Sequence, residues 1–71
     1  MLKGIIKDRK TGEPIIGASI AVEKESIGAI SDINGNFAIN VSADKKIVVS
    51  YIGYESQVLD VLDKSFLEIY L

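Results

Sequence analysis

Apolar residues alternate with polar or small residues along most of the chain, and this period of two restricts the fold more than any other feature of the sequence. Phe37, Ile39 and Val41, for example, are separated by single small or polar residues. Successive side chains of a β-strand point to opposite faces, so the pattern predicts strands with one buried face. Glycine, asparagine, aspartate and proline interrupt it about every eight to twelve residues, as in sandwiches and barrels. The sequence therefore predicts an all-β fold.

The turn signals divide the chain into seven predicted strands. These strands cover residues 2–7, 18–23, 27–31, 37–41, 47–52, 54–61 and 66–71. The segment 47–52 is apolar on both faces, which indicates a central strand. Seven strands in 71 residues cannot bury their apolar faces in one flat sheet. We therefore expect a Greek-key β-sandwich of two antiparallel sheets about 10 Å apart. Its expected core is Ile6, Ile20, Val22, Phe37, Ile39, Val41, Val49, Val58, Leu67 and Ile69.

The residue types that most enzymes and metal sites use are missing. The chain has no cysteine and no histidine, which removes the thiolate nucleophile, the commonest metal ligand and the usual general base. Eight basic and ten acidic side chains give a net charge of −2, and the basic ones form no patch that could neutralise a nucleic-acid backbone. No apolar run is long enough for a membrane-spanning helix. We expect a domain that is not an enzyme, holds no cofactor or metal, and binds neither nucleic acid nor the membrane interior.

A segment that begins at Asp32 resembles the start of a calcium loop, because oxygen-bearing side chains stand at alternate positions. An EF-hand loop beginning there would need glycine at its sixth position and glutamate at its twelfth, where this chain has Phe37 and Ala43. Asn34-Gly35 is instead a strong hairpin signal. We therefore predict a tight hairpin turn in which Asp32 accepts hydrogen bonds from backbone amides.

Tyrosines raise the alternative of a carbohydrate-binding module, since such modules use aromatic side chains as platforms. Tyr51 and Tyr54 are an odd number of positions apart and would point to opposite faces of a regular strand. Only a bulge at Gly53 would align them. Otherwise each tyrosine, Tyr70 included, is expected to be partly buried with its hydroxyl at the rim.

Apolar side chains on an outer face indicate a docking surface. Val48 and Ile52 lie on the opposite face of their predicted strand from Val49 and Tyr51, so these residues cannot all enter the core. Exposed apolar patches commonly mark interaction sites, although a covering loop would explain them equally well. The candidate interaction surface consists of Val48, Ile52, Tyr51 and Tyr54, and an exposed sheet edge is the other candidate contact. No catalytic, cofactor-binding or metal-binding residue is a candidate.

Four short motifs follow one another across nearly the whole chain. They are Gly4-x-Ile6-x-Asp8, Gly12-x-Pro14-Ile15-x-Gly17-Ala18-x-Ile20-x-Val22, Gly28-x-x-Ser31-Asp32-x-x-Gly35-x-Phe37-x-Ile39-x-Val41 and Ser50-Tyr51-Ile52-Gly53-Tyr54. Together they resemble the carboxypeptidase-regulatory-like domain. The resemblance implies a seven-stranded transthyretin-like β-sandwich whose motif residues are scaffold, and it transfers no active-site residues.

The resemblance is strongest to the domain at the N-terminus of SusC-like TonB-dependent outer-membrane transporters of Bacteroidota. It implies that residues 1–71 are one domain of a larger protein, located at the periplasmic face of the outer membrane as a non-catalytic accessory domain of a nutrient or glycan importer. The implied partners are the rest of the transporter, a SusD-like lipoprotein and the TonB-type energising complex. Similar domains accompany peptidases and other cell-surface proteins, so a structural accessory of such a protein is the alternative.

We expect Phe37→Ala to leave the domain largely unfolded. A chain of this length has a free energy of unfolding of about 4–10 kcal/mol, and truncating a core phenylalanine to alanine costs about 3–5 kcal/mol. Thermal melting followed by circular dichroism checks this. A cooperative melt close to that of the wild type would show that the sandwich prediction is wrong.

Overall fold

Seven β-strands account for the regular structure of the chain. The computed structural model describes residues 1–62 and 64–71, and no helix occurs among them. The strands are β1 (Leu2–Lys7), β2 (Ser19–Val22), β3 (Gly28–Ile30), β4 (Asn36–Ile39), β5 (Lys46–Ser50), β6 (Gln57–Asp60) and β7 (Phe66–Tyr70). All seven predicted strands are confirmed, and the largest difference is at β6, which begins three residues after the predicted start at Tyr54.

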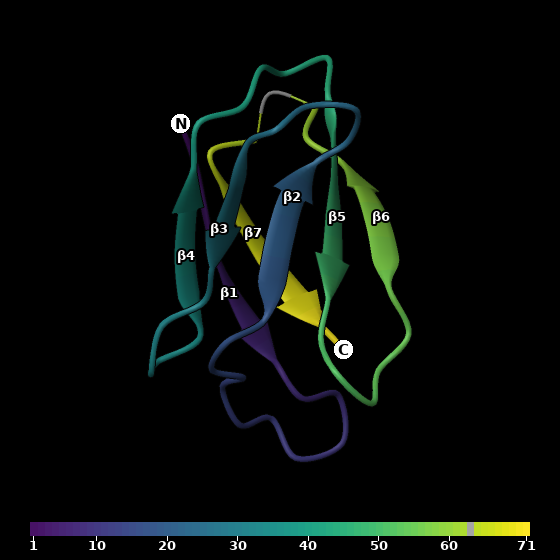
Figure 1. Cartoon of the computed structure of the whole chain (residues 1–71). Coiled ribbons are helices and arrows are strands. Elements are labelled where there is room, and N and C mark those ends of the chain that lie inside the picture. The colour runs from purple at the N-terminus through teal and green to yellow at the C-terminus, as the bar shows by residue number, and fades with distance from the viewer. Residues whose placement is uncertain (63) are drawn as a thin grey trace.

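The strands form two sheets that lie in two layers (Figure 1). The three-stranded sheet has the order β4-β1-β7, and the four-stranded sheet has the order β3-β2-β5-β6. β5 pairs with β2 on one side and with β6 on the other, which confirms the prediction of a central strand. The β1–β2, β3–β4 and β5–β6 connections lie at the same end of the sandwich as the carboxyl terminus. The fold therefore gathers three loops at that end.

β1 and β7 pair in parallel, so the prediction of two antiparallel sheets is wrong for the three-stranded sheet. Gly4 lies opposite Leu67, and Ile6 lies opposite Ile69. The chain crosses from one sheet to the other between β6 and β7, and β7 then runs beside β1 in the same direction. Alternation along a strand indicates which face is buried but not which way the strand runs. The other strand pairs are antiparallel.

The turn at Asp32 forms as predicted, but the strands on either side of it enter different sheets. The Gly35 amide donates to the Asp32 carbonyl at 2.8 Å, and Gly35 has a φ of 79°. The Asp32 carboxylate accepts from the amides of Asn34 and Asn36, both at 2.9 Å, which confirms its predicted capping role. β3 belongs to the four-stranded sheet and β4 to the three-stranded sheet. The prediction of a paired hairpin is therefore wrong, because the turn joins two layers.

The core lies between the two sheets and draws side chains from both. Its buried members are Leu2, Ile6, Ile15, Ala18, Ile20, Val22, Phe37, Ile39, Ile47, Val49, Val61, Ile69 and Leu71. Val41 and Leu67 are only partly buried, and Val58 is 55% exposed, so the prediction of Val58 in the core is wrong. The inward residues of β6 are Gln57 and Leu59, which pair with buried Val49 and Ile47. Shifting a strand pattern by one residue moves every side chain to the other face, and this explains the error.

Gly4 and Phe37 fit together where β1 crosses the middle of the three-stranded sheet. They are register partners on β1 and β4. A Cβ atom added at position 4 would lie 2.5 Å from Cε2 of Phe37 and 2.5 Å from the carbonyl oxygen of Leu67. No real Cβ atom packs that closely against backbone, so the Phe37 ring requires glycine at position 4.

The Ser31 side chain forms hydrogen bonds with the chain segment that leads into β2. It is the buried polar residue of the described part of the chain, at 3% exposure. Its hydroxyl donates to the Ile15 carbonyl at 2.7 Å and accepts from the Ala18 amide at 2.8 Å. Two backbone groups that lie far from Ser31 in sequence therefore depend on this one side chain.

We expect Ser31→Ala to lower the free energy of unfolding by about 1–3 kcal/mol, because it leaves a buried donor and a buried acceptor without partners. Denaturant unfolding of the variant and the wild type measures the difference. Ser26→Ala is the matched control, since Ser26 is exposed between β2 and β3. Equal stability of the two variants would contradict the role of the hydroxyl.

Candidate interaction site

The predicted interaction residues centre on the turn that follows β5. β5 ends at Ser50, so the prediction that Tyr51 and Ile52 belong to this strand is wrong. The Tyr54 amide donates to the Tyr51 carbonyl at 3.1 Å, which closes a four-residue turn. Gly53 has a φ of 85°, in the left-handed region that glycine enters without strain. This turn places Ile52 at its tip, where the side chain is 92% exposed.

The turn brings Tyr51 and Tyr54 together. Their ring centroids are 5.8 Å apart and the ring planes are inclined by 43°. This separation is within the range in which aromatic pairs attract each other. A strand bulge is the geometry expected to align the two tyrosines, and the structure aligns them with a tight turn instead. Tyr54 is 38% exposed, so the pair presents an aromatic surface to solvent.

Asp8 anchors Tyr54 to the β1–β2 loop. The Tyr54 hydroxyl donates to the Asp8 carboxylate, and the same carboxylate accepts from the amides of Lys10 at 2.7 Å and Thr11 at 3.1 Å. The hydrogen bond from Tyr54, followed by the two backbone bonds, lowers the pKa of Asp8 below its ordinary value. The same contact raises the pKa of Tyr54, because it stabilises the protonated hydroxyl. Two loops that are distant in sequence are thereby held side by side.

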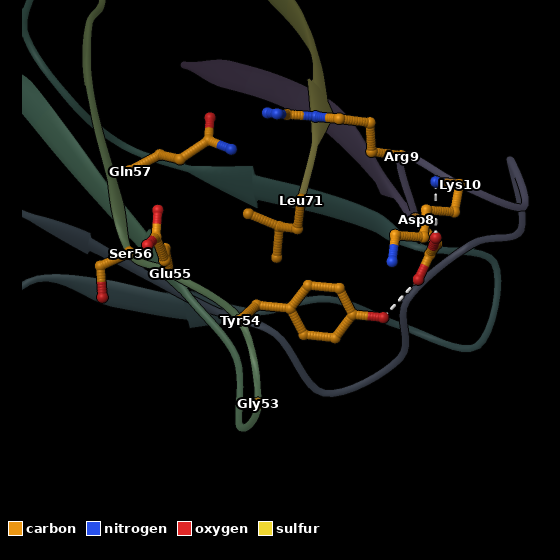
Figure 2. Close-up of a pocket in the computed structure, with 9 residues that line it drawn as sticks. All are labelled: Asp8, Arg9, Lys10, Gly53, Tyr54, Glu55, Ser56, Gln57 and Leu71. Atoms are coloured by element: carbon orange, nitrogen blue, oxygen red, sulfur yellow. Dashed lines mark hydrogen bonds between the residues drawn. The ribbon is translucent and has the colours of Figure 1, made fainter.

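A groove of about 820 Å³ opens beside Tyr54 (Figure 2). Residues 8–10 line one side, residues 53–57 line the other, and Leu71 lies between them. Arg9 and Lys10 bring positive charge to the groove, and Gln57 brings an amide. Figure 2 shows the Tyr54 ring with its hydroxyl directed at Asp8. The groove therefore combines an aromatic wall with charged and hydrogen-bonding groups, as small-ligand and peptide sites do.

Val48 belongs to a different part of the surface from the tyrosine turn. It lies on the outward face of the four-stranded sheet, where it pairs with Ala21 on one side and Val58 on the other. Val48 is half-buried and Val58 is exposed, and together with Ala21 they form an apolar row across the sheet. The four predicted residues therefore divide between a sheet face and the adjacent loop.

Sequence reasoning did not single out Asp8, Arg9, Gln57 or Val58 as members of this surface. Asp8 is part of the first motif, Gly4-x-Ile6-x-Asp8, and that was the available signal. Nothing in the spacing of Asp8 and Tyr54 indicates their contact, since 46 positions separate them.

Metal-ligand clusters and membrane-spanning helices are both absent from the described residues. Within residues 1–62 and 64–71, no three carboxylates gather closely enough to hold a metal ion. The same residues contain no helix that is long and apolar enough to cross a membrane. What the fold and this surface define is a small all-β sandwich domain whose distinctive exposed groups are aromatic and apolar.

The chain belongs to the CarboxypepD_reg-like domain family, whose model matches residues 2–70. This match confirms the resemblance drawn from the four motifs. A relative, the TonB-dependent receptor SusC of Bacteroides thetaiotaomicron, is 48% identical to the chain over 60 residues. The match covers 84% of this chain but 6% of that receptor. The chain is thus similar to one small part of a much longer protein.

Tyr54→Phe should raise the pKa of Asp8 toward its ordinary value, because the hydroxyl makes the largest contribution to lowering it. A group whose pKa is lowered on folding contributes stability above its unfolded pKa, and this contribution is lost as the pH falls through the lowered value. NMR titration of the Asp8 carboxyl carbon measures the change. Tyr70→Phe is the control, since the Tyr70 hydroxyl donates to Glu68. An Asp8 titration that is the same in Tyr54→Phe as in the wild type would contradict the contact.

Proposed function

We propose that this domain is a non-catalytic accessory module of a SusC-like TonB-dependent outer-membrane transporter. The observation that carries the proposal is the 48% identity to a TonB-dependent receptor over 84% of the chain. Its family, named a regulatory-like domain, agrees with an accessory role. The absence of histidine and cysteine from the sequence also favours a binding role over catalysis.

In this proposal the domain lies at the periplasmic face of the outer membrane, and the transporter imports glycans or other nutrients. The domain acts by surface complementarity, as a folded platform for protein partners. The partners are the rest of the transporter, the TonB-type energising complex and a SusD-like lipoprotein. The strand order β4-β1-β7 and β3-β2-β5-β6 supports our assignment of the fold to the transthyretin-like Greek-key sandwiches.

The contact surface in this proposal is the apolar row around Val48 together with the turn that carries Ile52. Ile52 is 92% exposed and lies in one turn with the aromatic pair Tyr51 and Tyr54, so it belongs to an apolar and aromatic patch of the kind that commonly marks an interaction site. Tyr51 and Tyr54 flank it with aromatic side chains, which are enriched at protein interfaces.

We expect Ile52→Asp, made in the full-length protein that carries this domain, to reduce nutrient uptake severalfold while the amount of protein in the outer membrane stays unchanged. A buried charge at an interface without a partner is strongly unfavourable. Uptake of a labelled substrate by whole cells, with the protein quantified by immunoblot, measures the effect. Ile33→Asp is the matched control, because Ile33 is 74% exposed in the β3–β4 turn. Normal uptake in Ile52→Asp, or an equal loss in both variants, would reject the contact surface.

A second candidate function, direct capture of a glycan, gains support from the pairing of Tyr51 and Tyr54. The aromatic pair stands beside a groove with charged and amide side chains, a combination that suits sugar rings and hydroxyl groups. Calorimetric titration of the chain with α-linked and β-linked gluco-oligosaccharides distinguishes the two functions. Binding heat that disappears in Tyr51→Ala and Tyr54→Ala but persists in Tyr70→Ala would favour capture. The accessory role predicts no binding heat.

A further inference from the structure

The two sheets of the sandwich are unequal, and the shorter one is incomplete on a particular side. β6 forms the outer edge of the four-stranded sheet, and Figure 1 shows no described strand of the other layer behind it. On that side, the three-stranded sheet ends at β7. Leu59 on β6 and Leu67 on β7 are inward-facing residues that pack against the core but are only partly buried. One additional strand beside β7 would cover both leucines.

The hydrogen bonds of β7 show which of its backbone groups face this open side. Lys3 donates to the Ser65 carbonyl at 3.0 Å, Leu71 donates to the Lys7 carbonyl at 2.9 Å, and the Leu71 carbonyl accepts from Arg9 at 2.8 Å. Residues 65 and 71 therefore bond toward β1, and the intervening odd-numbered residues do so as well in a regular parallel ladder. The amides and carbonyls of Phe66, Glu68 and Tyr70 consequently point away from β1.

A side-chain contact confirms this direction at one end of the strand. The Tyr70 carbonyl accepts from Nε2 of Gln57 at 2.7 Å and from the Arg9 guanidinium at 3.2 Å. Both donors reach it from outside the ladder, and both also line the groove beside Tyr54. The open edge of β7 therefore runs directly into that groove.

β7 lacks most of the features that prevent an edge strand from pairing with another strand. Between Phe66 and Tyr70 there is no proline, no lysine and no residue with positive φ. Such features are what natural proteins use to keep an edge strand from accepting another strand. β7 is also longer than the opposite outer strand, β6, by five residues to four.

The outward side chains of this edge indicate what would pair with it. Phe66 and Tyr70 are both aromatic, and their side chains are 55% and 38% exposed. Glu68 stands between them, and its neighbour on β1 is Ile5 rather than a basic residue. A second copy of this chain, paired antiparallel in the register that uses the whole edge, would place Glu68 directly against Glu68, which is unfavourable. A strand with a basic residue at that position, flanked by β-branched or aromatic residues, complements the edge in both charge and shape.

We propose that the free edge of β7 accepts an extended segment of a partner protein as a fourth strand, with a lysine or arginine of that segment opposite Glu68. The added strand pairs with the backbone of Phe66 and Glu68 and with the Tyr70 amide, since the Tyr70 carbonyl already accepts from Gln57 and Arg9. Its inward side chains cover Leu59 and Leu67. This is β-strand addition, in which backbone bonds give affinity and alternate side chains give specificity. The proposal goes beyond the surface around Val48 and Ile52, and it does not depend on the transporter assignment, because its test uses the chain alone.

The test is an NMR titration of the isotope-labelled chain with two synthetic peptides. Both peptides alternate threonine and valine and have blocked ends, and they differ in a central residue, lysine in one and glutamate in the other. We expect saturable shifts of the amides of Phe66, Glu68 and Tyr70 with the lysine peptide. Exchange of an attractive for a repulsive cross-strand pair should weaken the glutamate peptide roughly fivefold. Shifts centred on other strands, equal affinities, or no shifts with either peptide would overturn the proposal.

Glu68→Pro is the decisive variant, because it removes an amide hydrogen that no ladder bond uses. Edge strands accept proline at such positions, so the fold should persist, as unchanged shifts of β2 and β5 would show. Binding of the lysine peptide should then be lost. The matched variant Glu68→Gln keeps the amide hydrogen and loses only the charge, so it should still bind the lysine peptide, more weakly than the wild type does. If Glu68→Pro fails to fold, Phe66→Pro at the first residue of β7 replaces it. Wild-type affinity in a folded proline variant would overturn the proposal, and so would concentration-dependent dimerisation through β7.

Discussion

The ring of Phe37 occupies the space that any side chain at position 4 would fill, and the close approach of the three strands β4, β1 and β7 depends on this fit. β1 is the middle strand of its sheet, so its backbone must approach β4 and β7 on either side while the Phe37 ring lies over it. Only glycine permits that approach. On its other side β1 pairs in parallel with β7, and this pairing brings the end of the chain back to the β1–β2 loop.

The candidate site is a consequence of that return. Arg9 and Asp8 follow β1, Leu71 follows β7, and the turn after β5 meets them at the same end of the sandwich. The hydrogen bond between Tyr54 and Asp8 joins the two loops, and Gln57 reaches the last carbonyl of β7. The groove, the aromatic pair and the open edge of β7 are therefore neighbouring features of one surface, although each would recognise a different kind of partner.

Much of the fold follows from local sequence patterns, and the errors have definite causes. Alternation located every strand, and the capping role of Asp32 follows from its own turn. The hairpin prediction failed because a tight turn fixes the local chain reversal but not the sheet that each strand enters. The prediction for Val58 is wrong because the apolar pattern of β6 is mixed, and only the pairing of β6 with β5 decides which of its residues face the core. The family resemblance rested on glycines and alternating aliphatics, which are scaffold residues, so it identified the fold without identifying the site.

By itself the sequence determined the number of strands, the buried face of most of them and the lack of the usual catalytic and metal-binding side chains. These properties depend on residue type and on neighbours within a few positions. Only the tertiary structure decided the direction of β7, the pairing of Tyr51 with Tyr54, the contact of Tyr54 with Asp8 and the open edge beside Glu68. These features arise from contacts between residues that are far apart along the chain or from a backbone turn at Gly53, and a period-two pattern carries no information about either.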